Sequence, residues 1–186
     1  VLREVLDFDD AIKVAYDFYM QHPDETLIVV TADHETGGMA LGNSDYTLNL
    51  KVLAEQKCSS DLLSDQLSAL QKEAGKHLTW EQVKEVISKN TGLYTVVEIS
   101  KEEDQLLQAA FGQMMQHQGV EKSLYKDINA LASKALAILN QKSRLGWTSK
   151  GHTASAVPVF AIGVGAERFT GWHDNSEIAP LIYEAT

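Results

Sequence analysis

Asp33 and His34 are the residues of this sequence best suited to chemistry. They follow the apolar run 27–30 and stand just before a loop that contains two consecutive glycines. A carboxylate and a neutral imidazole are both good ligands for a zinc-like divalent ion, and a zinc site needs about four ligands, or three and a water. Asp33 and His34 are therefore a candidate pair of metal ligands, provided that the backbone bends between them. The alternative is structural, with Asp33 capping the following turn and His34 packed on a sheet edge.

His152 is a third candidate ligand. It lies about 120 residues after His34, beside a glycine and at the entrance to a second apolar run at 157–165. Glycine allows the backbone to approach another group closely. A histidine that only packs at the entrance to a strand is the alternative.

No catalytic or ligand role is expected for the other polar residues near these positions. Glu35 is expected to be an exposed loop acid, and Ser149 and Ser155 are expected to be ordinary loop serines, since no adjacent base would activate them as nucleophiles. No role is assigned to His173 or Asp174.

The two apolar runs predict the elements that position these residues. Each run reads as a strand buried on both faces, which is typical of a parallel sheet in an α/β fold. In open α/β sheets ligands bind at the carboxyl ends of the strands, where Asp33 and His34 stand. Apolar residues at alternating spacings of three and four predict an amphipathic helix over residues 1–20.

The middle of the chain predicts a different structure. Residues 44–146 are expected to form a mostly helical insertion, because apolar stripes and capping signals dominate them. Thr79 with Gln82 and Ser100 with Glu103 match the capping box. Two short strands are also expected, one at 39–42 and a weak one at 48–52 for which a helix is the alternative. The other expected helices run from Ser60 or Asp61 to Gly75 and from Lys122 to Gln141. A terminal helix is expected after Trp172, with Pro180 in its first turn.

Composition limits the classes of function. The 186 residues carry a formal net charge of −10, which argues against nucleic acid as a partner, since phosphate backbones would be repelled. A small phosphate ester bound at metal ions is still allowed. No apolar stretch approaches the length of a bilayer span, and the single cysteine, Cys58, cannot form an internal disulfide.

Two short strings resemble a known family. Thr31-Ala-Asp-His34 at the end of an apolar strand, followed by Gly151-His152-Thr153 before another strand, is similar to the carboxyl-terminal part of an alkaline phosphatase. The segment 6–12 also resembles the family's helix ahead of this strand. The resemblance covers residues 1–43 and 147–186, which would belong to the α/β catalytic core, while 44–146 would form a lid or crown.

The resemblance implies a fold and a set of ligands. The fold would be a three-layer α/β/α arrangement with a mostly parallel sheet. Asp33 and His34 would bind one zinc ion and His152 a second. In the family the two ions activate the attacking serine, and later a water, and stabilise the leaving oxygen, in line with two-metal displacement chemistry.

The resemblance also implies what this chain lacks. The serine nucleophile, the ligands of a magnesium ion and the remaining zinc ligands would lie upstream of Val1, so we expect a fragment that is inactive by itself. The substrates would be small phosphate monoesters, and the protein would be periplasmic or secreted. A phosphodiesterase or sulfatase of the same superfamily, or a non-catalytic helical interaction module, is the alternative function. The insertion could make a homodimer contact, which no sequence feature decides.

Overall fold

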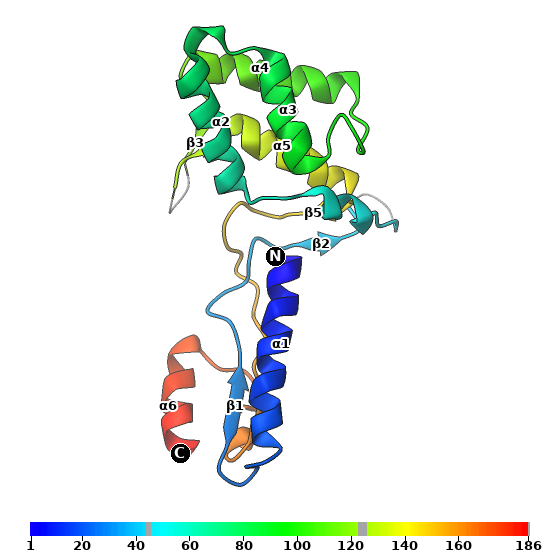
Figure 1. Ribbon diagram of the computed structural model, residues 1–186. Coiled ribbons are helices and arrows are strands. Elements are labelled where there is room, and N and C mark those ends of the chain that lie inside the picture. The colour runs from blue at the N-terminus through cyan, green and yellow to red at the C-terminus, as the bar shows by residue number, and fades with distance from the viewer. Residues whose placement is uncertain (44–45, 123–125, 186) are drawn as a thin grey trace. The chain divides into compact units, whose positions relative to one another are not determined.

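The chain forms two compact units (Figure 1). The computed structural model describes residues 1–43, 46–122 and 126–185. One unit consists of residues 1–38 and 149–186, and the other consists of residues 39–148. The division expected from the sequence, with 1–43 and 147–186 as a catalytic core and 44–146 as a lid or crown, stays a prediction.

The first unit is built around one strand pair. Its elements are α1 (Leu2–Tyr19), β1 (Leu27–Val30), β6 (Phe160–Gly163), the 3-10 helix η3 (Ala166–Phe169) and α6 (Asn175–Ala185). Figure 1 shows α1 and α6 on either side of β1, and the strand contacts both α1 and η3. The expected helix at the start of the chain is confirmed, and a strand forms in each of the two apolar runs. The expected burial on both faces is not found, since Phe160 of β6 is 65% exposed.

The prediction of a mostly parallel sheet is not confirmed. β1 and β6 pair antiparallel, with Leu27 opposite Gly163 and Val30 opposite Phe160. Every strand pair among the described residues is likewise antiparallel. An apolar run indicates that a strand is covered on both faces, but the direction of its neighbour depends on the path of the connecting chain. All four residues of β1 are half-buried.

The second unit is mostly helical. Its helices are η1 (Leu50–Glu55), α2 (Ser60–Ala74), η2 (Gly75–His77), α3 (Trp80–Thr91), α4 (Lys101–Met115) and α5 (Ala130–Lys142). Its short strands are β2 (Ala40–Leu41), β3 (Val120–Glu121), β4 (Ile128–Asn129) and β5 (Leu145–Gly146). α5 contacts α2, α3 and α4. The helices bury a set of fully inaccessible apolar side chains: Leu63, Leu67, Val83, Ile87, Leu93, Leu107, Leu131 and Leu139.

The helix starts in this unit follow local capping signals. Both expected capping boxes are present, with Thr79 accepting from the Gln82 backbone and Ser100 from the Glu103 backbone while the Gln82 and Glu103 side chains bond back. Ser59 caps α2, one residue before the expected position. Because these bonds span three residues, the sequence alone was enough to place them.

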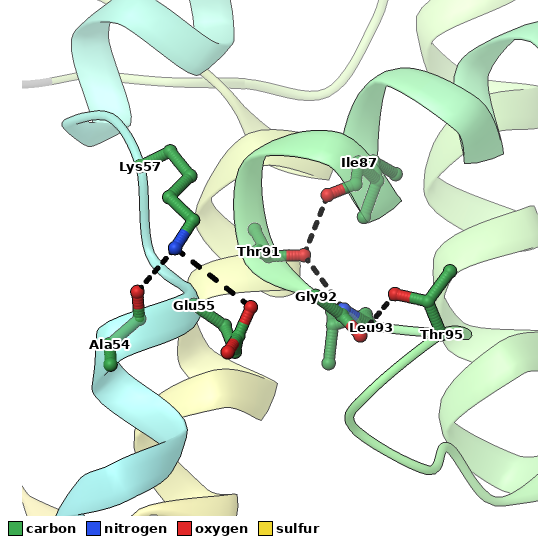
Figure 2. Close-up of polar contacts among 8 residues, drawn as sticks. All are labelled: Ala54, Glu55, Lys57, Ile87, Thr91, Gly92, Leu93 and Thr95. Carbon is green, nitrogen blue, oxygen red and sulfur yellow. Dashed lines mark hydrogen bonds and ion pairs between the residues drawn. The ribbon is translucent and has the colours of Figure 1, made fainter.

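The end of α3 is closed by a glycine packed against η1 (Figure 2). Gly92 has a φ of 71° and donates its N–H to the Ser88 carbonyl over 2.8 Å. A Cβ at Gly92 would lie 2.7 Å from the Glu55 Cβ, so both the backbone conformation and the close approach require glycine. Figure 2 also shows the Lys57 ammonium, which donates to the Ala54 carbonyl over 2.6 Å and lies 3.9 Å from the Glu55 carboxylate.

Three of the expected elements differ in the structure. The segment expected to be a strand at 48–52 forms the 3-10 helix η1 from Leu50 to Glu55. The helix expected from Lys122 begins only at Ala130, because Ile128–Asn129 pairs with Val120–Glu121 and Asn129 caps the helix; part of the expected segment, residues 123–125, lies outside the described residues. Pro180 lies inside α6 as its sixth residue and not in its first turn.

Hydropathy of the helices gives one further finding. None of the helices in the described ranges combines the length and the apolar character needed to cross a membrane.

Candidate metal site

The chain bends directly after β1, and the bend brings the side chains of Asp33 and His34 together. The Asp33 Oδ1 accepts a hydrogen bond from the His34 backbone N–H over 3.0 Å. The Asp33 Oδ2 lies 3.2 Å from the His34 Nε2. The side chain of Asp33 is 85% exposed and that of His34 is 37% exposed, so both groups are open to a ligand.

The other ring nitrogen of His34 is fixed by the backbone. The Nδ1 lies 2.7 Å from the Glu35 carbonyl oxygen. A carbonyl oxygen can only accept, so Nδ1 carries the proton and donates. In the neutral ring, Nε2 then presents a lone pair 3.2 Å from a carboxylate oxygen.

His152 lies beside this pair. Its imidazole stacks on that of His34, with the ring centroids 3.5 Å apart and the planes inclined by 24°. The two segments that carry the histidines are far apart in the sequence and belong to the same unit. The structure therefore brings together the three residues that the sequence singled out.

Glu35 is not the exposed loop acid that the sequence predicted. It is half-buried, and its Oε1 accepts from the Gly38 N–H over 2.6 Å. Its Oε2 is buried and has no hydrogen-bond partner among the described residues. The loop can fold back onto this side chain because Gly37 and Gly38 have φ values of 72° and 62°. The spacing of a glutamate three residues before a glycine is the signal that could have indicated this role.

The loop at Gly37 is joined to the segment of His152. The Gly37 carbonyl accepts from the Ser149 N–H over 3.1 Å. The Ser149 hydroxyl donates to the His152 carbonyl over 3.2 Å and accepts from the Gly151 N–H over 3.3 Å. Ser149 is therefore a structural link between the loops, a role that the sequence did not reveal.

The remaining candidates lie outside this group or have structural roles. Asp174 directly precedes α6, and its backbone N–H donates to the Glu177 carboxylate. The Asp174 Oδ1 accepts from the hydroxyl and the backbone N–H of Ser176, and these bonds lower the pKa of the Asp174 carboxyl. The His173 Nε2 is buried without a partner among the described residues. Ser155 bonds to Thr153.

The donor set fits part of a metal site. Zinc takes imidazole nitrogen and carboxylate oxygen at about 2.0–2.2 Å in a tetrahedron, so neighbouring donor atoms stand about 3.3 Å apart. The 3.2 Å between Nε2 of His34 and Oδ2 of Asp33 matches this separation. Within residues 1–43, 46–122 and 126–185, no group of three or more histidine, cysteine or acidic side chains is arranged to hold a metal ion.

The first unit combines a strand pair with flanking helices, and the candidate ligand pair follows its strand β1 directly. Comparison with known proteins gives the family. The alkaline phosphatase family model matches residues 1–186, and the chain belongs to this family.

Relatives and a solved structure agree with this assignment. Alkaline phosphatase 4 of Bacillus subtilis is 30% identical over 184 residues, which cover 98% of this chain and 34% of the relative. Alkaline phosphatase 3 of the same organism is 30% identical over 186 residues, covering 99% of this chain and 35% of the relative. The repressible alkaline phosphatase of Saccharomyces cerevisiae is 25% identical, covering 97% of this chain and 32% of the relative.

The crystal structure of a cold-active alkaline phosphatase from a Shewanella species superposes with a TM-score of 0.67 and 28% sequence identity. The match covers 97% of this chain and 39% of that structure. The chain thus has the fold of part of an alkaline phosphatase, and it spans about a third of the length of the curated relatives.

Proposed function

We propose that this chain is the carboxyl-terminal portion of a zinc-dependent alkaline phosphatase that hydrolyses small phosphate monoesters. The observation that supports this most directly is the 3.2 Å between the Asp33 carboxylate and the His34 imidazole, which stacks on His152, in a chain of that family. Asp33 and His34 would hold one zinc ion, and His152 would hold the other.

The assignment of His152 to a second ion follows the family resemblance. Its imidazole stacks on that of His34 with the centroids 3.5 Å apart, which places it close enough to belong to the same site. Two ions in one site would match the two-metal chemistry of in-line displacement.

The residues of this chain would bind and orient. The Glu35 carbonyl keeps the proton of His34 on Nδ1, which leaves Nε2 free to act as a ligand. The bound ions would supply an activated oxygen nucleophile and a stabilised leaving oxygen. The serine nucleophile, the ligands of a magnesium ion and the remaining zinc ligands are expected in the part of the relatives that this chain does not span.

The alternative functions have less support from the residues and the family match. A phosphodiesterase or sulfatase would share the metal site, but the family match favours a monoesterase. A non-catalytic helical module would give the Asp33–His34 pair no ligand role. Export to the periplasm or the medium rests on the resemblance alone, and a homodimer contact through the insertion 44–146 is a further prediction.

The test uses the complete parent protein and the isolated chain. We expect Asp33→Ala to lower the zinc affinity of the complete protein, and its turnover of nitrophenyl phosphate, by more than the roughly 10–100-fold lost when a residue that merely orients a ligand is changed. Asp24→Ala, in the exposed turn before β1, is the matched control and should change neither quantity.

Two results would contradict the proposal. Unchanged zinc binding in Asp33→Ala would remove the basis for a metalloenzyme. Sustained turnover by the isolated chain, at a rate unaffected by zinc chelation, would place the chemistry on residues other than those described.

A further inference from the structure

We propose that Glu35 is a positioning residue that holds the loops of His34 and His152 in one arrangement through a continuous hydrogen-bonded relay. This inference rests on the proposed function, because it concerns how the same candidate ligands are oriented. No motif in the sequence assigns Glu35 such a role.

The first step of the relay is within the loop after β1. Glu35 holds His34 with its backbone carbonyl, which accepts from Nδ1 over 2.7 Å, and it holds the turn with its carboxylate, which accepts from the Gly38 N–H over 2.6 Å. The carboxylate therefore fixes the turn that also fixes the carbonyl facing the imidazole.

The second step crosses to the other loop. The turn held by Glu35 presents the Gly37 carbonyl to the Ser149 N–H over 3.1 Å. The Ser149 hydroxyl then donates to the His152 carbonyl over 3.2 Å. Gly37 is buried and Ser149 is half-buried, while the bond from the Ser149 hydroxyl to the His152 carbonyl is exposed. The backbone that carries the His152 imidazole is thus tied to the loop of His34.

The Glu35 side chain keeps this position at a cost. Its Oε2 is buried without a partner among the described residues, and an unsatisfied buried acceptor is destabilising. An exposed rotamer would avoid this penalty but would give up the bond from the Gly38 N–H to Oε1.

The experiment compares three variants of the complete parent protein, prepared without metal, by NMR of the imidazoles. In Glu35→Ala we expect the nitrogen shifts of His34 to lose the signature of an Nδ1-protonated ring, and the ring-current shift between His34 and His152 to disappear. In Glu35→Gln both should stay, because the amide oxygen can still accept from Gly38. Glu25→Ala, in the exposed turn before β1, is the control.

A fourth variant separates the two steps. Ser149→Ala keeps the backbone bond to Gly37 but removes the hydroxyl that holds the His152 turn. It should leave the protonation pattern of His34 unchanged and weaken only the ring-current shift. In the complete protein, Glu35→Ala should weaken zinc binding about 10–100-fold and Glu35→Gln less than about threefold.

The outcomes distinguish this inference from the proposed function. If the wild-type chain shows the NMR signature and Glu35→Ala loses it, the positioning role stands even where zinc does not bind, and only the proposed function fails. If Glu35→Ala keeps the signature, the inference fails whatever the zinc affinity. A Glu35→Gln variant as impaired as Glu35→Ala would make the charge essential and would also overturn the positioning role.

Discussion

Gly163 lies at one end of the β1–β6 strand pair, in the same unit as the candidate site, and alanine at this position should push the two strands apart. Gly163 lies opposite Leu27 with a φ of 104°. A Cβ built there would overlap the Thr26 carbonyl oxygen and lie 3.3 Å from the Leu27 Cα. These are backbone atoms, so no rotamer change can relieve the overlap and the two strands must move apart. That movement also stretches the 3.0 Å bond from the Val164 N–H to the Thr26 carbonyl.

Gly171 provides a matched control. Its φ is 107°, but a Cβ there would meet nothing within 4 Å. Both alanine variants have the backbone strain of this φ region, about 1–3 kcal/mol. Only Gly163→Ala adds a forced backbone shift of about 1–3 kcal/mol and the loss of a hydrogen bond of about 1 kcal/mol. We therefore expect Gly163→Ala to destabilise the strand pair by about 2–4 kcal/mol more than Gly171→Ala does.

Amide hydrogen exchange can measure this difference locally. A loss of about 2–4 kcal/mol corresponds to amide exchange about 30- to 900-fold faster, up to the rate of an unprotected amide. The acceleration should appear in residues 27–30 and 160–164, and the amides of α5 in the other unit should keep their rates. Equal rates for the two variants, or acceleration spread equally over both units, would refute the reasoning.

Two more predictions concern the helical unit. Gly92→Ala should lower the free energy of unfolding by about 1–3 kcal/mol, because Gly92 has a left-handed φ and an added Cβ would lie 2.7 Å from the Glu55 Cβ. Gly112→Ala, inside α4 and with nothing within 4 Å of the added Cβ, should raise it by about 0.5–1 kcal/mol. Guanidinium unfolding midpoints that shift in the same direction for both variants would contradict this. Burial and a 2.7 Å bond to Asp104 raise the pKa of the Tyr94 phenol, so its contribution to stability is complete below about pH 10 and is lost as pH rises toward the folded-state pKa. Tyr94→Phe should cost about 1 kcal/mol at pH 8 and should lose stability less steeply than the wild type above pH 10; parallel pH profiles of the two would contradict this assignment.

The parts of the fold that the sequence predicted depend on short-range chemistry. The capping boxes at Thr79 and Ser100 join atoms three residues apart, and a side chain that meets the backbone at that distance needs no information from elsewhere in the chain. The candidate ligands were also found locally, because Asp33 and His34 directly follow an apolar strand.

The parts that the sequence did not predict depend on distant partners. Residues 128 and 131 fit a helical stripe, yet Ile128 pairs with Glu121, and this pairing delays the start of α5. The direction of β6 relative to β1 is likewise decided by a connection more than 100 residues long, about which an apolar pattern says nothing. Periodicity indicates which face of an element is covered, and it does not identify the covering segment.

The candidate site combines both kinds of information, and this explains why candidate ligands could be proposed from the sequence while the environment of Glu35 could not. A ligand is recognised by its own chemistry, since imidazole and carboxylate bind zinc wherever they occur. A positioning residue is recognised only by what it holds. Glu35 gains its role because Gly37 and Gly38 turn the loop back onto its carboxylate, and because that turn meets Ser149 from the far end of the chain. A search for such residues must therefore begin from the folded loops and the partners of each buried polar atom.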